Sequence, residues 1–301
     1  MTDYAALLRE IAVPRLVGTP NHQLVRAALR RELAARGFAV EEHVFSGRPS
    51  WMLLGTPRVV QGVNLIAIRP SGRPPATARE SFRDRPTIWL TAHYDSKGQP
   101  ISMAARLAGV VALVVGAAGL VVALVPALVL LAAGVLVLSQ NRATDRSPGA
   151  VDNASGLLAA LAIVDRLPSS VSVGLILLDA EEFGLLGARA LARDRPELLR
   201  DAAVVNFDGL DDAGRPIAFL HRRGPVGEAV AEAVHAIGAP WWPVVVDGIA
   251  LAGPAGECVT IMKGGWGTTR VVHTPRDTAG RLTLAGALEV AEGVARALGA
   301  R

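Results

Sequence analysis

Cysteine, lysine and aromatic side chains are all scarce in this sequence of 301 residues. The single cysteine, Cys258, excludes an intramolecular disulfide and is compatible with a reducing compartment. Lys97 and Lys263 are the only lysines, and the arginines that supply nearly all the positive charge lie among acidic residues, leaving a formal net charge of +4. Because the chain has no polybasic run and no basic stripe studded with aromatic residues, we expect no nucleic-acid partner.

The N-terminus also lacks the uninterrupted apolar core of a secretory signal peptide. Asp3, Arg9, Glu10 and Arg15 are spread through its first 17 residues. We therefore expect no export by the usual route, and we expect a helix at 3–12 instead.

Hydrophobic residues are abundant, at 51% of the chain, which is enough for the core of a large α/β domain. Apolar runs of strand length alternate with segments of helical periodicity, and this alternation favours helices packed on a largely parallel sheet. We expect a single domain over 1–301 with the fold of a three-layer α/β sandwich around a mixed, largely parallel sheet. The expected strands are 59–68, 87–92, 171–178, 203–206 and 216–221, with short strands near Val259 and Val271, and the expected helices are 3–12, 21–36, 154–167, 185–193, 226–237 and 284–298.

Metal-binding types of side chain stand where the apolar strands end. His93 follows one strand, the segment 179–182 another, and Asp208 a third. In open α/β sheets, ligands bind at the carboxyl ends of the parallel strands, so these side chains are expected to gather at one edge. Taken singly, each of these residues is weak evidence for a metal site. A histidine at a strand end is more often structural, and Asp152, before the helix expected at 154–167, fits an N-cap.

Five motifs in a fixed order strengthen the signal. They are TAHYDS at 91–96, GAVDNASG at 149–156, DAEEFGLLG at 179–187, VNFD at 205–208 and HTPRDT at 273–278. From about Val59 to the C-terminus the chain resembles the co-catalytic di-zinc aminopeptidases of the bacterial leucyl aminopeptidase and aminopeptidase Y type. The resemblance implies a zinc-peptidase, phosphorylase-like fold and a hydrolase that removes N-terminal residues from a peptide substrate.

The resemblance also implies a role for each matching residue. His93 and Asp208 would bind one zinc, Glu182 and His273 the other, and Asp152 would bridge the two Zn²⁺ ions, although the same ligands accept other divalent metals. Glu181 would act as the general base toward the attacking water. Asp95 would orient His93 by accepting a hydrogen bond from the other ring nitrogen. A cis peptide bond is expected between Asp152 and Asn153.

One segment departs from the resemblance. Between Ser96 and Pro148 the relatives have a short loop, whereas this chain has a run from Leu107 to Leu138 without a charged residue. We expect an inserted apolar helical hairpin at 101–140, with arms at 103–124 and 127–139 that contact membrane lipid as a transmembrane or re-entrant segment. Arg106, Arg142 and Arg146 would lie at the lipid head groups, and the catalytic domain would face the cytoplasm. An alternative is a soluble hairpin that covers the active site or packs in an oligomer.

Two other functions remain open from the sequence. A glutaminyl-cyclase-like acyltransferase shares the expected fold and similar metal residues, and HYDSK at 93–97 is similar to its motif, but that branch uses one zinc. A non-catalytic membrane scaffold with the peptidase fold is the second alternative, although such proteins lose ligands and this chain retains the whole set. The number of metal ions bound per chain distinguishes these functions.

Overall fold

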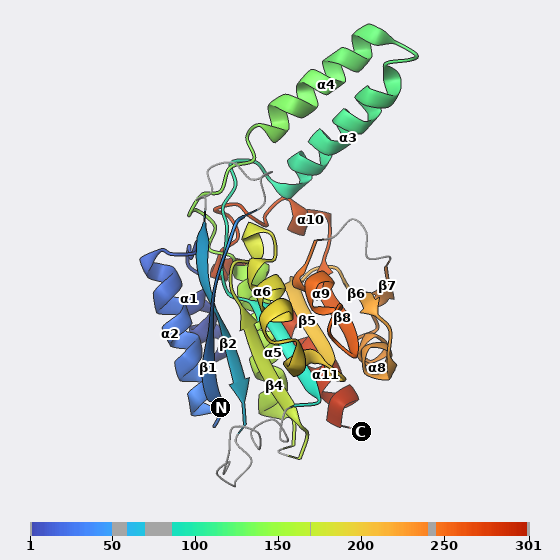
Figure 1. Cartoon of the computed structure of the whole chain (residues 1–301). Coiled ribbons are helices and arrows are strands. Elements are labelled where there is room, and N and C mark those ends of the chain that lie inside the picture. Colours follow the sequence, from blue (N-terminus) through green and yellow to red (C-terminus); the bar gives the residue numbers. More distant parts are fainter. Residues whose placement is uncertain (1, 50–58, 70–85, 169, 240–244, 300–301) are drawn as a thin grey trace.

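The computed structural model describes residues 2–49, 59–69, 86–168, 170–239 and 245–299. Their centre is an eight-stranded sheet with the strand order β1-β2-β4-β3-β5-β8-β6-β7. The strands are β1 (Ala39–Gly47), β2 (Val60–Ile68), β3 (Ile88–His93), β4 (Val173–Leu178), β5 (Ala203–Leu210), β6 (Arg215–Arg222), β7 (Ile237–Gly238) and β8 (Glu257–Gly264). Helices cover both faces of this sheet, so the three-layer α/β fold predicted from the sequence is confirmed (Figure 1).

Side chains of the central strands alternate between two hydrophobic cores, as the pleat of a strand requires. Leu90 and Leu175 point into the larger core, whereas Trp89 and Ile176 point into the smaller one. The helices of the larger core are α1 (Tyr4–Ile11), α2 (Pro20–Ala35), α5 (Gly156–Arg166), α8 (Pro225–Ala233) and α11 (Ala285–Gly299), and those of the smaller core are α6 (Leu186–Asp194), α7 (Pro196–Leu199) and α9 (Asp247–Leu251). Burial on both faces explains why β4 is apolar throughout and why β3 and β5 are mostly apolar.

The direction of the strands determines where a site can form. β3 is parallel to both β4 and β5, and β5 is parallel to β8, whereas the pairs β1–β2, β2–β4 and β6–β8 are antiparallel. Four neighbouring strands therefore end at the same edge of the sheet.

Three local predictions were wrong. The edge strand β1 was missed, because most of its residues are exposed and several of them are polar. The strand expected near Val271 is instead a turn after the short helix α10 (Trp266–Thr269), where the Val271 amide donates to the Thr268 carbonyl at 2.9 Å. The helix expected at 226–237 ends at Ala233, and residues 237–238 form β7.

Two helices, α3 (Met103–Gly119) and α4 (Leu124–Leu138), project from the body of the molecule side by side (Figure 1). Glycines allow their close approach: a Cβ atom on Gly134 would lie 2.7 Å from Leu113, and one on Gly116 would lie 3.0 Å from the Ala127 carbonyl oxygen. The first helix is shorter than expected from the sequence, since it ends at Gly119 rather than near residue 124.

No helix in the described ranges is both long and apolar enough to cross a membrane. The transmembrane helix expected from the sequence therefore has no support in the structure.

Candidate metal centre

The five predicted ligands come from five separate segments at the carboxyl edge of the sheet. His93 is the last residue of β3 and Asp208 lies near the end of β5. Glu182 lies in the short turn η2 (Glu181–Phe183) directly after β4, and Asp152 lies in the irregular turn η1 (Ala150–Ser155) that leads into α5. His273 follows α10 and has a positive φ of 64°. Parallel strands thus supply two of the ligands, and turns or loops supply the other three.

The side chains of these residues form two groups that share one carboxylate. His93, Asp152 and Asp208 make up the first group, and Asp152, Glu182 and His273 make up the second. In each group the possible ligand atoms lie within 4.8 Å of one another. The structure therefore brings together all five residues singled out from the sequence, with Asp152 between the two groups.

Individual distances show how Asp152 faces both histidines. Its Oδ1 lies 3.1 Å from His93 Nε2, and its Oδ2 lies 2.8 Å from His273 Nε2. Asp208 Oδ1 is 3.8 Å from His93 Nε2, and Glu182 Oε1 is 3.0 Å from His273 Nε2. One oxygen of the shared carboxylate is thus directed to each group.

The donor set fits divalent metal ions. His93 Nε2 and Glu182 Oε1 are buried and have no hydrogen-bond partner among the described residues, although both lie close to other possible ligands. Buried polar atoms without a partner are rare in proteins. Imidazole nitrogen and carboxylate oxygen are the ligands that zinc takes in catalytic sites, and a pair of ions can share a bridging carboxylate.

Charge at the site is concentrated and buried. Burial would raise the pKa of Asp152, but His273 and His93 outweigh it and hold this pKa well below its ordinary value. Burial raises the pKa of Glu181 well above its ordinary value, and Glu182, Asp247 and Asp208 add to this while His93 opposes it. Burial thus favours the protonated form of the Glu181 carboxyl.

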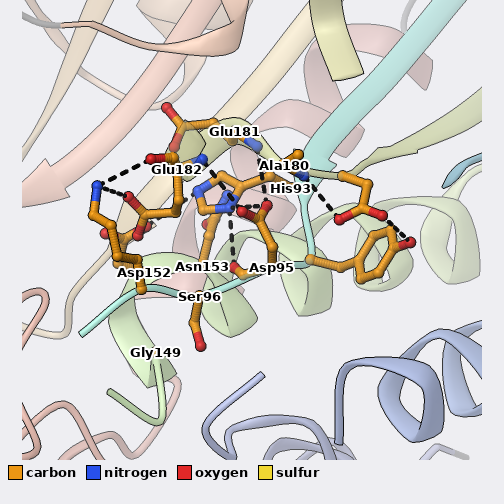
Figure 2. A network of polar contacts seen from close by, with 12 residues as sticks. His93, Asp95, Ser96, Gly149, Asp152, Asn153, Ala180, Glu181 and Glu182 are labelled. Atoms are coloured by element: carbon orange, nitrogen blue, oxygen red, sulfur yellow. Dashed lines mark hydrogen bonds and ion pairs between the residues drawn. The ribbon is translucent and has the colours of Figure 1, made fainter. Parts of the chain in front are cut away.

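Asp95 differs in detail from its expected role. The Nδ1 atom of His93 lies 3.2 Å from the main-chain carbonyl oxygen of Asp95 and 3.5 Å from its carboxylate. The carboxylate instead accepts hydrogen bonds from the amides of Glu181 at 3.1 Å and Glu182 at 3.2 Å (Figure 2). Asp95 thus holds the turn that carries the double glutamate, while its main chain faces the His93 ring.

The turn that carries Asp152 is fixed from two sides. The carboxylate of Asp277 accepts hydrogen bonds from the amides of Val151 at 2.8 Å and Asp152 at 3.2 Å. Asn153 donates to the Phe207 carbonyl at 2.8 Å, next to Asp208 on β5. The expected cis peptide bond between Asp152 and Asn153 is confirmed.

Three residues of the site were not identified from the sequence. Lys97 Nζ lies 2.8 Å from Glu182 Oε2, and its position directly after the TAHYDS motif was the available signal. Asp247, at the start of α9, is buried with neither carboxylate oxygen hydrogen-bonded to a described residue, and burial raises its pKa to about 8. Arg106, which was expected at lipid head groups, lies against His273, with Nη2 at 2.5 Å from Nδ1.

Solved structures with a similar fold include enzymes of two kinds. The aminopeptidase from Aneurinibacillus sp. strain AM-1 has a TM-score of 0.66 and 12% sequence identity, covering 98% of this chain and 92% of that chain. BSAP, a zinc aminopeptidase from Bacillus subtilis, has a TM-score of 0.65 and 13% identity, covering 98% and 93%. Porphyromonas gingivalis glutaminyl cyclase has a TM-score of 0.63 and 17% identity, covering 98% and 95%. At these identities the likeness shows the fold alone.

The sequence, rather than the fold, shows the family to which the chain belongs. No curated protein matches the chain. The sequence model of peptidase family M28 matches residues 75–250, which is more than half of the chain. The chain therefore belongs to peptidase family M28.

Proposed function

We propose that this chain is a zinc-dependent aminopeptidase with two metal ions per chain. The observation that carries the proposal is the pair of complete ligand groups that share Asp152. His93 and Asp208 would hold one ion, Glu182 and His273 the other, and Asp152 both. Manganese or cobalt would fit the same ligands.

The chain's own residues fit the roles that peptide hydrolysis needs. The ions, when bound, supply charge that polarises the substrate carbonyl and lowers the pKa of the attacking water. Glu181 is placed beside the ligand Glu182 without belonging to either ligand group, so its carboxylate is available to take the proton from the water and pass it to the leaving amine. The Asp95 carboxylate holds the Glu181–Glu182 turn by accepting hydrogen bonds from the amides of both glutamates. Asp277 holds the main chain at Asp152 in the same way.

Purified protein loaded with zinc is expected to hydrolyse aminoacyl p-nitroanilides and short unblocked peptides. Removal of the metal by a chelator should abolish this hydrolysis because both ligand groups lose their ions, and added zinc should restore it. Initial rates measured on a panel of aminoacyl substrates test the proposal. An absence of hydrolysis across the panel in zinc-loaded protein would contradict it.

A glutaminyl cyclase activity is the second candidate, because glutaminyl cyclases are among the structures that share this fold. The completeness of both ligand groups favours the peptidase, since a cyclase of the kind considered above uses one zinc. Peptides with N-terminal glutamine separate the two functions. Cyclisation without hydrolysis, together with one metal ion per chain, would support the cyclase.

We also propose that the α3–α4 pair contacts a lipid surface. Its aliphatic side chains are widely exposed, and Val121 and Val122 at its tip are 91% and 86% exposed. The segment from Leu107 to Leu138 carries no charge that would have to be desolvated on insertion. The strength of binding at a membrane interface grows with the apolar area that is buried in lipid.

Replacing both Val121 and Val122 by Asp is expected to abolish co-sedimentation of the protein with vesicles of phosphatidylcholine and phosphatidylglycerol. Two carboxylates at the tip would have to be desolvated on insertion. Val44→Asp, at an exposed valine on β1, is the matched control and should co-sediment like the wild type. Wild-type protein that stays in the supernatant would contradict the proposal, as would a dimer in solution that the tip variant disrupts.

A further inference from the structure

The partly buried arginine at the base of α3 is the basis of the inference. Arg106 lies in the first turn of this helix, where its amide donates to the Ser102 carbonyl at 3.0 Å. Its Nη2 atom lies 2.5 Å from Nδ1 of His273. The inserted helical pair therefore places one cationic side chain directly against a predicted metal ligand.

Arg106 lacks the partners that the other buried cations of this edge have. Lys97 is paired with Glu182 at 2.8 Å, and Arg15 donates to main-chain carbonyls, including those of Tyr94 at 2.6 Å and Gly149 at 3.0 Å. The Arg106 guanidinium forms no ion pair with a described carboxylate, and its Nε is buried without a hydrogen-bond partner among the described residues. A guanidinium Nε–H that is buried without a partner is costly unless an acceptor such as an anion satisfies it.

The contact with His273 does not satisfy the donors of the Arg106 guanidinium either. Nε2 of His273 faces the shared carboxylate of Asp152 at 2.8 Å, so Nε2 is the atom directed at the second ligand group. A neutral imidazole that ligates through Nε2 carries its hydrogen on Nδ1, and it donates that hydrogen to an acceptor. A guanidinium has only donors, so in the metal-loaded enzyme Arg106 must direct its N–H groups to another acceptor.

A second residue whose main chain contacts the same histidine has an unsatisfied side-chain atom. The main-chain amide of Gln99 donates to the His273 carbonyl at 2.7 Å, and the side-chain Oε1 of Gln99 is buried without a hydrogen-bond partner among the described residues. Arg106 and Gln99 thus both contact His273, the first through its side chain and the second through its main chain, and each has one buried side-chain atom without a partner among the described residues. Groups of this kind are suited to a polar ligand at this position.

We propose that Arg106 binds a carboxylate of the substrate and makes the enzyme selective for peptides that carry one next to the scissile bond. The inference rests on the proposed peptidase function and adds the substrate class. A carboxylate matches the planar guanidinium and can accept two parallel hydrogen bonds from it. The position against His273 places this carboxylate near the reacting carbonyl, so its source is the C-terminus of a dipeptide or an acidic side chain next to the cleaved bond.

Substrate pairs that differ only in one carboxylate test the proposal. We compare leucyl-glycine with leucyl-glycinamide for the C-terminal carboxylate, and glutamyl with glutaminyl p-nitroanilide for the side chain. Arg106→Gln is expected to lower the ratio of kcat/KM for the charged over the uncharged member by about tenfold or more in at least one pair, mostly through KM. Arg106→Lys should keep part of the ratio, because it retains the charge but not the paired hydrogen bonds. The pair that responds identifies the source of the carboxylate.

Arg142→Gln, which removes an exposed arginine that follows α4, is the matched control and should keep the wild-type ratio. Metal content should be the same in all three variants, which separates recognition of the substrate from damage to the site.

Binding of the two leucyl dipeptides to Glu181→Gln protein, measured by calorimetry with and without Arg106→Gln, gives a readout that needs no turnover. An unchanged ratio in both pairs, or an equal loss for charged and uncharged members, would overturn the proposal. Failure of the peptidase function itself would show differently, as absence of hydrolysis of every substrate by the wild type.

Discussion

Replacing Glu181 by Gln is expected to lower peptide hydrolysis by about 10²- to 10⁴-fold while the metal content stays at that of the wild type. The amide of Gln has nearly the shape of the carboxylate but cannot accept the proton of the attacking water. Burial raises the pKa of the Glu181 carboxyl well above its usual value, which strengthens it as a proton acceptor. Glu181 belongs to neither ligand group, so its replacement removes no metal ligand. Initial rates and metal quantitation on the same preparation measure both effects.

A surface glutamate provides the control for this substitution. Glu228 is exposed on α8, and Glu228→Gln should hydrolyse peptides at the wild-type rate. Retention of most of the activity in Glu181→Gln would remove this residue from the role of base. Loss of metal together with activity would instead assign it to the ligands.

Replacing Asp152 by Asn is expected to produce the opposite pattern, in which metal binding is lost first and hydrolysis with it. Each oxygen of this carboxylate faces one histidine of the two ligand groups. An amide supplies only one oxygen and no negative charge, so neither ion keeps its shared ligand. We expect the affinity for metal to fall by more than about 100-fold, beyond the effect of losing a residue that only orients a ligand. Metal titration monitored by calorimetry measures this change.

Asp194→Asn is the matched control, because Asp194 is a surface aspartate paired with Arg193. It should bind metal like the wild type. Full occupancy of both sites in Asp152→Asn protein would contradict the bridging role, even if the activity were lost. The two substitutions therefore separate the base from the bridge.

Much of the site could be predicted because its residues stand at strand ends within short motifs. His93 and Asp208 terminate apolar runs, and the carboxyl ends of parallel strands meet at one edge. The core strands were recognisable for a related reason, since burial on both faces makes them mostly apolar. The edge strand Ala39–Gly47 has no such pattern, because most of its residues face solvent.

The residues that were missed depend on contacts between distant segments. Arg106 lies 167 positions before His273 in the chain, and its apolar surroundings in the sequence suggested lipid head groups instead. Asp247 stands at the start of a five-residue helix with no motif to mark it. Asp95 was correctly placed near His93, but the sequence could not show that its carboxylate would accept two amides of the turn after β4.

Anomalous X-ray scattering at the zinc edge, from crystals of the zinc-loaded protein, tests the central claim most directly. The account predicts two peaks per chain: one beside His93 and Asp208, the other beside Glu182 and His273, with the Asp152 carboxylate between them. A single peak, or none at these side chains, would contradict it.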